Sequence, residues 1–220
     1  MSAKKLYDEL IAAGIIGATG ETHFTLHGLP TLVRDSSIVG NVIQEWLKAF
    51  MTNKGIKYRN KPNSQEFPDF LLHDTDNQID LLEVKCFKKS PNFDVANFLA
   101  YCESLTVDPY RLDADYLIFE YVETLTGIEI KRIWLKKVWQ ICCAMERSAV
   151  RIQWKKNVHV NIRPATWYAN TMQYPIFETR LAFVQAIKKV LDTSASAGAL
   201  QKGWITKVKT LYKKQTGQEL

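Results

Sequence analysis

Two apolar runs flank a polar break in this chain: FPDFLL (residues 67–72), HDTDNQ (73–78) and IDLLEVK (79–85). Apolar runs bounded by an Asp/Asn cluster are typical of two strands joined by a turn. Because strand side chains alternate between faces, Glu83 and Lys85 should share one face and lie roughly 6–7 Å apart along the strand. Asp69 on the first strand can supply a second carboxylate. Two carboxylates beside a lysine suit a hard divalent cation and chemistry on water or a phosphate.

These residues resemble a known motif. Pro68, Asp69, Glu83, Val84 and Lys85 are similar to the PD-(D/E)xK motif of the nuclease superfamily that includes most type II restriction endonucleases. The resemblance implies an α/β fold with a mixed central β-sheet of four or five strands flanked by helices, a restriction-endonuclease-like core. The alternative is structural: Asp69 belongs to a turn, and Glu83 and Lys85 form a solvated pair.

The resemblance also implies a mechanism. Asp69 and Glu83 would each give a carboxylate oxygen to one or two Mg²⁺ ions, and the carbonyl of Val84 would be a further ligand. The metal would activate a water molecule and neutralise charge on the scissile phosphate. Lys85 would hold or deprotonate the attacking water and face the developing negative charge.

A long amphipathic helix is expected at residues 36–53, before the motif. Glu45 falls at the rim of its wide apolar arc, about 20° from Ile38 on a helical wheel. In several families of this superfamily such a helix lends a further acidic residue to the metal site, so the resemblance makes Glu45 a candidate catalytic residue and metal ligand. Alternatively, Glu45 reaches water at the rim. Gln44 is expected to point further away, into solvent.

The length and composition suit one folded domain. The 220 residues are 46% hydrophobic and carry a net charge of +6, which favours a polyanionic partner such as double-stranded DNA. The four cysteines form no Cys-x-x-Cys pair, which argues against a zinc site or disulfide scaffold and indicates a cytoplasmic protein. The apolar run at residues 10–18 is too short to span a bilayer, so we expect no membrane partner.

The rest of the chain is expected to alternate helices and strands. A single nuclease domain would cover residues 1–220, with a core at approximately 36–146 and C-terminal recognition or dimerisation elements at approximately 147–220. Residues 17–34 read as loop with a possible strand. Asp94 is the expected cap of the helix that begins there. The patterns predict strands at 115–123 and 128–135, and helices at 3–13, 94–105, 136–146, 177–192 and 203–214.

A strictly alternating hairpin is expected at residues 150–162, with Lys155, Lys156 and Asn157 at its turn. Its polar face would carry Arg151, Gln153, His159 and Asn161. Such a ribbon fits a DNA major groove, and Arg, Gln and Asn read purine edges; the alternative is a solvated sheet edge. The candidate DNA-binding residues are Lys88, Lys89, Arg151, Gln153, Lys155, Lys156, Asn161 and Arg163.

Within the superfamily, a compact chain of this size is most similar to a type II restriction endonuclease. This implies a homodimer that cuts double-stranded DNA at a short palindromic site. Three alternatives stay open: a structure-specific repair or Holliday-junction nuclease, a non-catalytic DNA-binding or protein-interaction module, and an α/β protein unrelated to nucleic acid.

Overall fold

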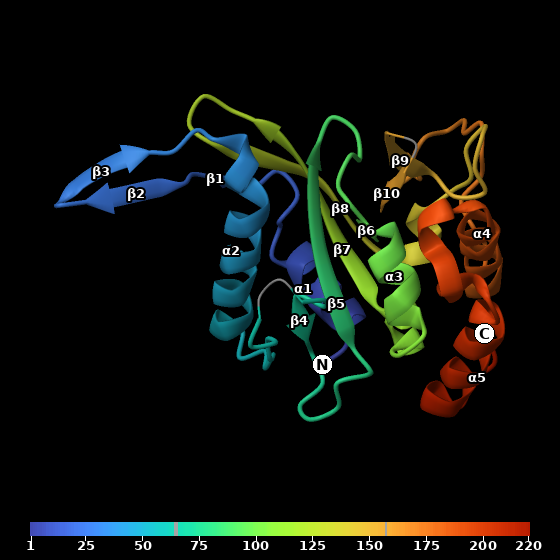
Figure 1. Ribbon diagram of the computed structural model, residues 1–220. Coiled ribbons are helices and arrows are strands. Elements are labelled where there is room, and N and C mark those ends of the chain that lie inside the picture. Colours follow the sequence, from blue (N-terminus) through green and yellow to red (C-terminus); the bar gives the residue numbers. More distant parts are fainter. Residues whose placement is uncertain (64–65, 157) are drawn as a thin grey trace. The chain divides into compact units, whose positions relative to one another are not determined.

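A computed structural model describes residues 1–63, 66–156 and 158–220 (Figure 1). The chain divides into two compact units. The first comprises Met1–Ser90 and Asp115–Lys136, and the second comprises Pro91–Ala114 and Lys137–Leu220. This division differs from the expected core at 36–146, because residues 91–114 pack with the C-terminal elements.

A five-stranded sheet forms the centre of the first unit, in the order β1-β8-β7-β5-β4. Strand β4 pairs with β5 antiparallel, and β5 pairs with β7 in parallel, so the sheet is mixed as expected. The two motif strands are thus neighbours. The strand bounds are β1 (Thr19–Gly20), β4 (Phe70–Leu71), β5 (Leu81–Lys88), β7 (Asp115–Glu123) and β8 (Ile128–Lys137).

Helices α1 (Ala3–Ala12) and α2 (Val39–Asn53) bury apolar side chains in one core with this sheet. Helix α2 follows a short 3₁₀ turn, η1 (Ser36–Ile38), so the expected helix at 36–53 is confirmed with a change of geometry at its start. Fully buried core members include Leu6, Leu10, Leu47, Met51, Phe70, Leu82, Leu117 and Phe119.

A hairpin of β2 (His23–Leu26) and β3 (Leu29–Leu32) occupies most of the segment expected to be loop. Its turn consists of His27 and Gly28, both at positive φ, +48° and +76°. Two central residues at positive φ form the tight turn that matches strand twist, and Asn-Gly is its usual sequence signal. The His-Gly pair lacks that signal, so the hairpin was missed.

The second unit contains a three-stranded sheet in the order β6-β10-β9 and several helices. The expected hairpin and the two C-terminal helices are confirmed. The elements are β6 (Ala96–Asn97), α3 (Phe98–Leu105), η2 (Pro109–Asp113), η3 (Val138–Ile141), β9 (Ile152–Lys155), β10 (Val158–Ile162), α4 (Arg180–Thr193), η4 (Ala195–Gln201) and α5 (Trp204–Thr216).

Two helix predictions in this unit were wrong in part. Helix α3 begins at Phe98, because Asn97 rather than Asp94 caps it by accepting a hydrogen bond from the Ala100 N–H at 3.1 Å. The helix expected at 136–146 is reduced to η3. Cys142 is extended, and its carbonyl and that of Cys143 accept hydrogen bonds from loops of the same unit instead of continuing a helix.

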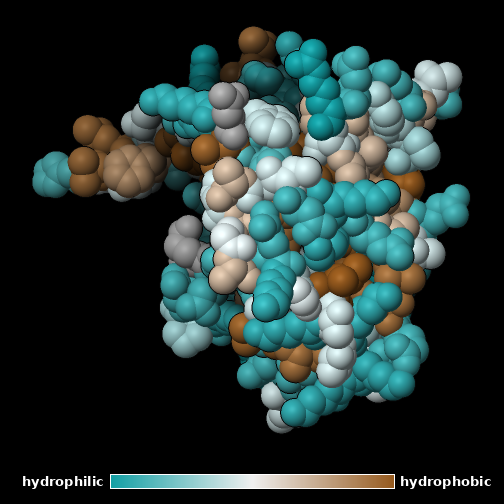
Figure 2. All heavy atoms as spheres, turned by 45° about the vertical axis from the view of Figure 1, so that its right-hand side comes forward, coloured by the Kyte–Doolittle hydropathy of each residue, from teal (hydrophilic) through white to brown (hydrophobic). Residues whose placement is uncertain are grey.

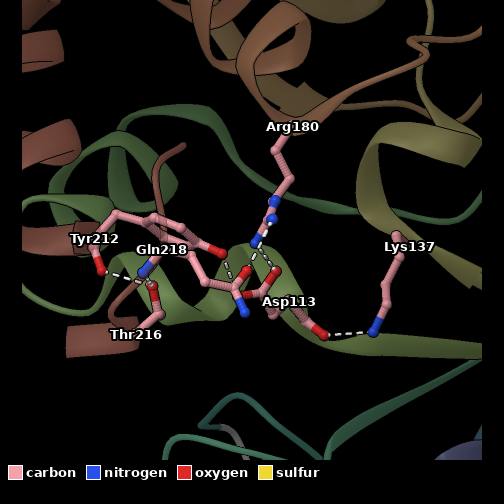
Figure 3. A network of polar contacts seen from close by, with 6 residues as sticks. All are labelled: Asp113, Lys137, Arg180, Tyr212, Thr216 and Gln218. Atoms are coloured by element: carbon pink, nitrogen blue, oxygen red, sulfur yellow. Dashed lines mark hydrogen bonds and ion pairs between the residues drawn. The ribbon is translucent and has the colours of Figure 1, made fainter.

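A polar network around Asp113 joins η2 to α4 and α5 (Figure 3). Arg180 Nη1 lies 2.5 Å from Asp113 Oδ1, and the Tyr212 hydroxyl donates to Asp113 Oδ2 at 2.6 Å. Lys137 Nζ donates to the Asp113 carbonyl at 2.6 Å. Both carboxylate oxygens of Asp113 are therefore satisfied, and one side chain fastens three elements of this unit.

Candidate active site

The two motif strands bring the three predicted catalytic side chains together. Lys85 Nζ lies 2.8 Å from Glu83 Oε1, which confirms that alternation along β5 places them on one face. Asp69 immediately precedes β4, and its Oδ2 accepts a hydrogen bond from the Val84 N–H of β5 at 2.7 Å. The Asn60 amide donates to the Asp69 carbonyl at 2.7 Å and holds this approach to β4. A carboxylate from each strand thus meets the lysine.

The electrostatics of this cluster are unfavourable in the protein alone. Burial and the neighbouring charge of Glu83 raise the pKa of Asp69 to about 6, against the opposing effects of the Val84 N–H, Lys85 and Gln44. Glu83 is 8% exposed, and its Oε2 atom is buried without a hydrogen-bond partner among the described residues. A buried, unpaired carboxylate oxygen is costly.

These residues fit a divalent cation. Two adjacent carboxylates, one with an orphaned oxygen, form the hard oxygen donor set that Mg²⁺ and Ca²⁺ bind, and a cation there would relieve the repulsion between them. No group of three or more His, Cys, Asp or Glu side chains is gathered for metal binding anywhere in residues 1–63, 66–156 and 158–220. A cation would therefore use two carboxylates and complete its ligands with other oxygens.

Helix α2 contributes Gln44, a residue that the sequence argument set aside. The Gln44 amide hydrogen-bonds the Asp69 carboxylate. Gly40, one turn earlier, lets the helix approach β5 closely, because a Cβ there would lie 3.5 Å from Cys86 Sγ. The buried stripe of α2 consists of Val39, Ile43, Leu47 and Met51. Gln44 lies about 80° from the centre of that stripe, at its edge.

The structure does not bring Glu45 to the other site residues. Its carboxylate pairs with Lys48 at 2.6 Å, and its side chain is 69% exposed. On the wheel Glu45 lies about 180° from the centre of the buried stripe. The expectation was wrong because it counted Ile38, which belongs to η1, and Trp46, which is 40% exposed, as members of the buried face.

Comparisons with known proteins agree with this arrangement. The sequence family described as NgoBV restriction endonuclease matches residues 1–220. The chain belongs to this family. The type II restriction enzyme NlaIV of Neisseria lactamica is 36% identical over 225 residues, which cover 100% of this chain and 93% of that protein. The type II restriction enzyme NgoBV of Neisseria gonorrhoeae is 33% identical over 159 residues, covering 71% of this chain and 91% of that protein.

A solved structure confirms the fold of the family. The NlaIV restriction endonuclease superposes with a TM-score of 0.93 at 37% identity, covering 100% of this chain and 92% of that one. The predicted α/β fold, with a restriction-endonuclease core and added C-terminal elements, is therefore confirmed. The suspected resemblance to type II restriction endonucleases is confirmed as well.

The predicted DNA-binding residues of the hairpin have mixed surroundings. Lys155, Lys156 and Arg151 are exposed. Gln153 and Arg163 satisfy each other instead, because Arg163 Nη2 donates to Gln153 Oε1 at 2.6 Å. Arg163 Nη1 also lies 2.8 Å from Asp94 Oδ1. Asn161 is half-buried, and Asn157 lies outside the described residues.

His159 does not share the solvated face of this hairpin as expected. It is 6% exposed, and its ring centroid lies 4.1 Å from that of Trp154. The pairing of β9 and β10 shifts by one residue between His159 and Ile162. A β-bulge of this kind reverses the side of the sheet to which the following residues point.

The two lysines after the motif lie at the end of β5. Lys88 Nζ pairs with Glu123 at 2.6 Å, so its charge is shared with the neighbouring strand β7. Lys89 is exposed and has a positive φ of 70°. In the described part of the chain, no helix is both long and apolar enough to cross a membrane.

Proposed function

We propose that this protein is a Mg²⁺-dependent type II restriction endonuclease, which hydrolyses phosphodiester bonds of double-stranded DNA at a specific short palindromic site. The observation that carries the proposal is the meeting of Asp69, Glu83 and Lys85 around the orphaned Glu83 Oε2 atom. It stands in a chain whose relatives are named type II restriction enzymes. That family membership favours this reading over a junction nuclease or a non-catalytic DNA-binding module.

Asp69, Glu83 and the Val84 carbonyl would hold one or two Mg²⁺ ions. When bound, Mg²⁺ lowers the pKa of a coordinated water and neutralises negative charge on the phosphate. The Val84 N–H and the Gln44 amide orient the Asp69 carboxylate. Gln44 thereby takes the helical position for which the sequence suggested Glu45, and we assign it a positioning role.

Lys85 acts directly on the reacting groups. Its ammonium, 2.8 Å from Glu83, is half-buried in the cluster. In that place it orients the attacking water and stabilises the negative charge that develops on the phosphate oxygens. A lysine is suited to this role because a compact ammonium contacts phosphate oxygens as a point charge.

We further propose that the exposed basic groups hold the DNA backbone. Point-charge contacts to phosphates position a duplex, whereas base-edge contacts select its sequence. The residues assigned to DNA binding are Lys88, Lys89, Arg151, Gln153, Lys155, Lys156, Asn161 and Arg163. A palindromic site requires two-fold symmetry, so we propose a homodimer. Its place would be the bacterial cytoplasm, where its DNA substrate and its four free cysteines are both compatible with the medium.

The test is direct. Purified protein incubated with phage DNA should give discrete bands with Mg²⁺ and none with EDTA. The Lys85→Ala protein should give no bands while keeping the circular dichroism spectrum of the wild type, because Lys85 lies in the site and not in the hydrophobic core. Cleavage retained by Lys85→Ala would remove the catalytic assignment. Cleavage of branched DNA regardless of sequence would replace the restriction enzyme with a junction nuclease.

A further inference from the structure

The hairpin of β2 and β3 leaves the body of the first unit and pairs only with itself among the described strands (Figure 1). Residues 22–33, which we call the arm, contain eight strand residues, and seven of these are exposed. A two-stranded hairpin alone in water is at best marginally stable. The arm thus has the properties of an element that is supported by a contact outside its own unit.

The exposed residues of the arm form an apolar face. Phe24 lies opposite Thr31, and Leu26 lies opposite Leu29. Directly opposed residues of an antiparallel pair share a face, so all three large apolar side chains project to the same side. Their exposed fractions are 56% for Phe24, 68% for Leu26 and 72% for Leu29. Figure 2 shows apolar side chains gathered on this projection.

A matching hollow lies in the same unit. A pocket of about 420 Å³ is bounded by the strand that precedes the arm, the segment that follows it, helix α2 and the strands β7 and β8. Trp46, which lines this pocket, is 40% exposed. Its apolar lining includes Val39, Val42, Ile43, Trp46, Phe119 and Ile128. The apolar arc of α2 is wide because one part packs in the core and another lines this pocket.

The charges of the arm and the pocket are complementary. The arm has no Asp, Glu, Lys or Arg and carries two histidines, His23 and His27, whose rings donate hydrogen bonds. The pocket lining includes three carboxylates and one guanidinium, those of Glu21, Asp35, Glu123 and Arg34. A DNA backbone would be repelled by that lining and would find no cation on the arm. The pair therefore fits a protein partner rather than DNA.

We propose that the arm of one protomer occupies the pocket of a second copy of this chain, and that the partner's arm occupies the pocket of the first. A two-fold axis makes such an exchange reciprocal, since each copy supplies both the projection and the hollow. The inference rests on the homodimer of the proposed function and names the surface that forms it. Trp46 would be the central contact of the interface, as exposed aromatic residues at hollows often are.

The test compares the full chain with two arm variants by sedimentation velocity over a range of concentrations. The wild type should sediment at twice the monomer mass of 25.3 kDa. Phe24→Asp with Leu26→Asp should sediment as a monomer, its dissociation constant raised at least ~30-fold by the loss of two central contacts. The matched control is Thr25→Asp, on the same strand and the opposite face, and it should remain dimeric.

Cross-linking supplies a second measurement. A Phe24→Cys protein mixed with a Trp46→Cys protein should form a disulfide-linked dimer under mild oxidation, whereas each protein alone should not. A monomeric wild type, a dimeric arm variant, a control that dissociates equally, or no cross-link in the mixture would each overturn the inference. So would an arm variant that loses DNA affinity while its mass is unchanged. Mg²⁺-dependent cleavage by the same samples reports separately on the proposed function.

Discussion

Asp69 in the first unit and Asp113 in the second are both partly buried carboxylates, and their surroundings differ in one respect. Burial raises the pKa of each. At Asp113 the charges of Arg180 and Lys137 oppose that effect, and both carboxylate oxygens have partners. At Asp69 the next largest effect after burial is the negative charge of Glu83, which raises the pKa further. One carboxylate is neutralised by the chain itself, and the other is placed beside a second acid.

The difference separates a group that holds the fold from a group that serves a reaction. Paired buried charges fasten elements, and removing one partner leaves the others unsatisfied. Two adjacent carboxylates with an orphaned oxygen lower the stability of the folded protein. That arrangement is sustained by the rest of the fold and leaves coordination capacity for a ligand. Perturbed groups of this kind concentrate at functional sites.

The largest expected effect comes from removing the charge at Asp69. Asp69→Asn should lower the cleavage rate at least ~10³-fold, because the pair that would hold the cation is broken. The same variant should be more stable in EDTA. A pKa raised from 3.8 to about 6 corresponds to roughly 3 kcal/mol of stability that the wild type lacks at neutral pH. We expect a rise of several degrees in Tm by thermal unfolding.

The pH dependence of this gain has a definite sign. Because folding favours the protonated form of Asp69, the wild type has its full stability below about pH 4 and loses it as the pH rises through about 6. The advantage of Asp69→Asn should therefore vanish in acid. Added Mg²⁺ should raise the Tm of the wild type and leave that of the variant unchanged. An Asp69→Asn protein less stable than the wild type at pH 8 would contradict the account of the site.

Asp113→Ala should show the opposite pattern. Removing this carboxylate leaves the Arg180 guanidinium and the Tyr212 hydroxyl without their partner, which should cost about 2–4 kcal/mol of unfolding free energy. Denaturant unfolding measures the loss, and the cleavage rate of the remaining folded protein should be unchanged. Tyr212→Phe is the control, because it removes one hydrogen bond and should cost about 1 kcal/mol. Loss of cleavage without loss of stability would place Asp113 in the catalytic machinery.

The sequence predicted the motif strands well because strand alternation leaves little freedom. A period of two residues assigns Glu83 and Lys85 to one face whatever the rest of the chain does, and the structure places them 2.8 Å apart. The fold followed from the same residues through their resemblance to a nuclease motif. The helical assignment was weaker, because the phase of a wide apolar arc depends on which part of it is buried. Residues that line a pocket are apolar too, and they displaced the expected centre of the buried stripe of α2.

Two further differences depend on backbone geometry that periodicity does not contain. The bulge between β9 and β10 buries His159, and the positive φ angles of His27 and Gly28 allow the hairpin that forms the arm. In both places a single residue changes the side to which its neighbours point or the direction of the chain. A regular pattern cannot report such a change. The orphaned Glu83 Oε2 atom likewise depends on packing between distant segments.

The smallest effects should come from neighbouring residues on α2, and they test how Asp69 is held. Gln44→Ala removes an amide that favours the charged form of Asp69, so its pKa should rise. Cleavage should fall about 10–100-fold, as for other groups that orient a metal ligand, and the acid limb of the rate–pH profile should move to higher pH. A merely structural role for Gln44 would lower the rate without that shift. Glu45→Ala is the matched control, since it removes only an exposed ion pair with Lys48 and should change stability by less than ~0.5 kcal/mol. If Glu45→Ala abolished cleavage and Gln44→Ala did not, the helix would act through its exposed acid, and the assignment of the amide would be wrong.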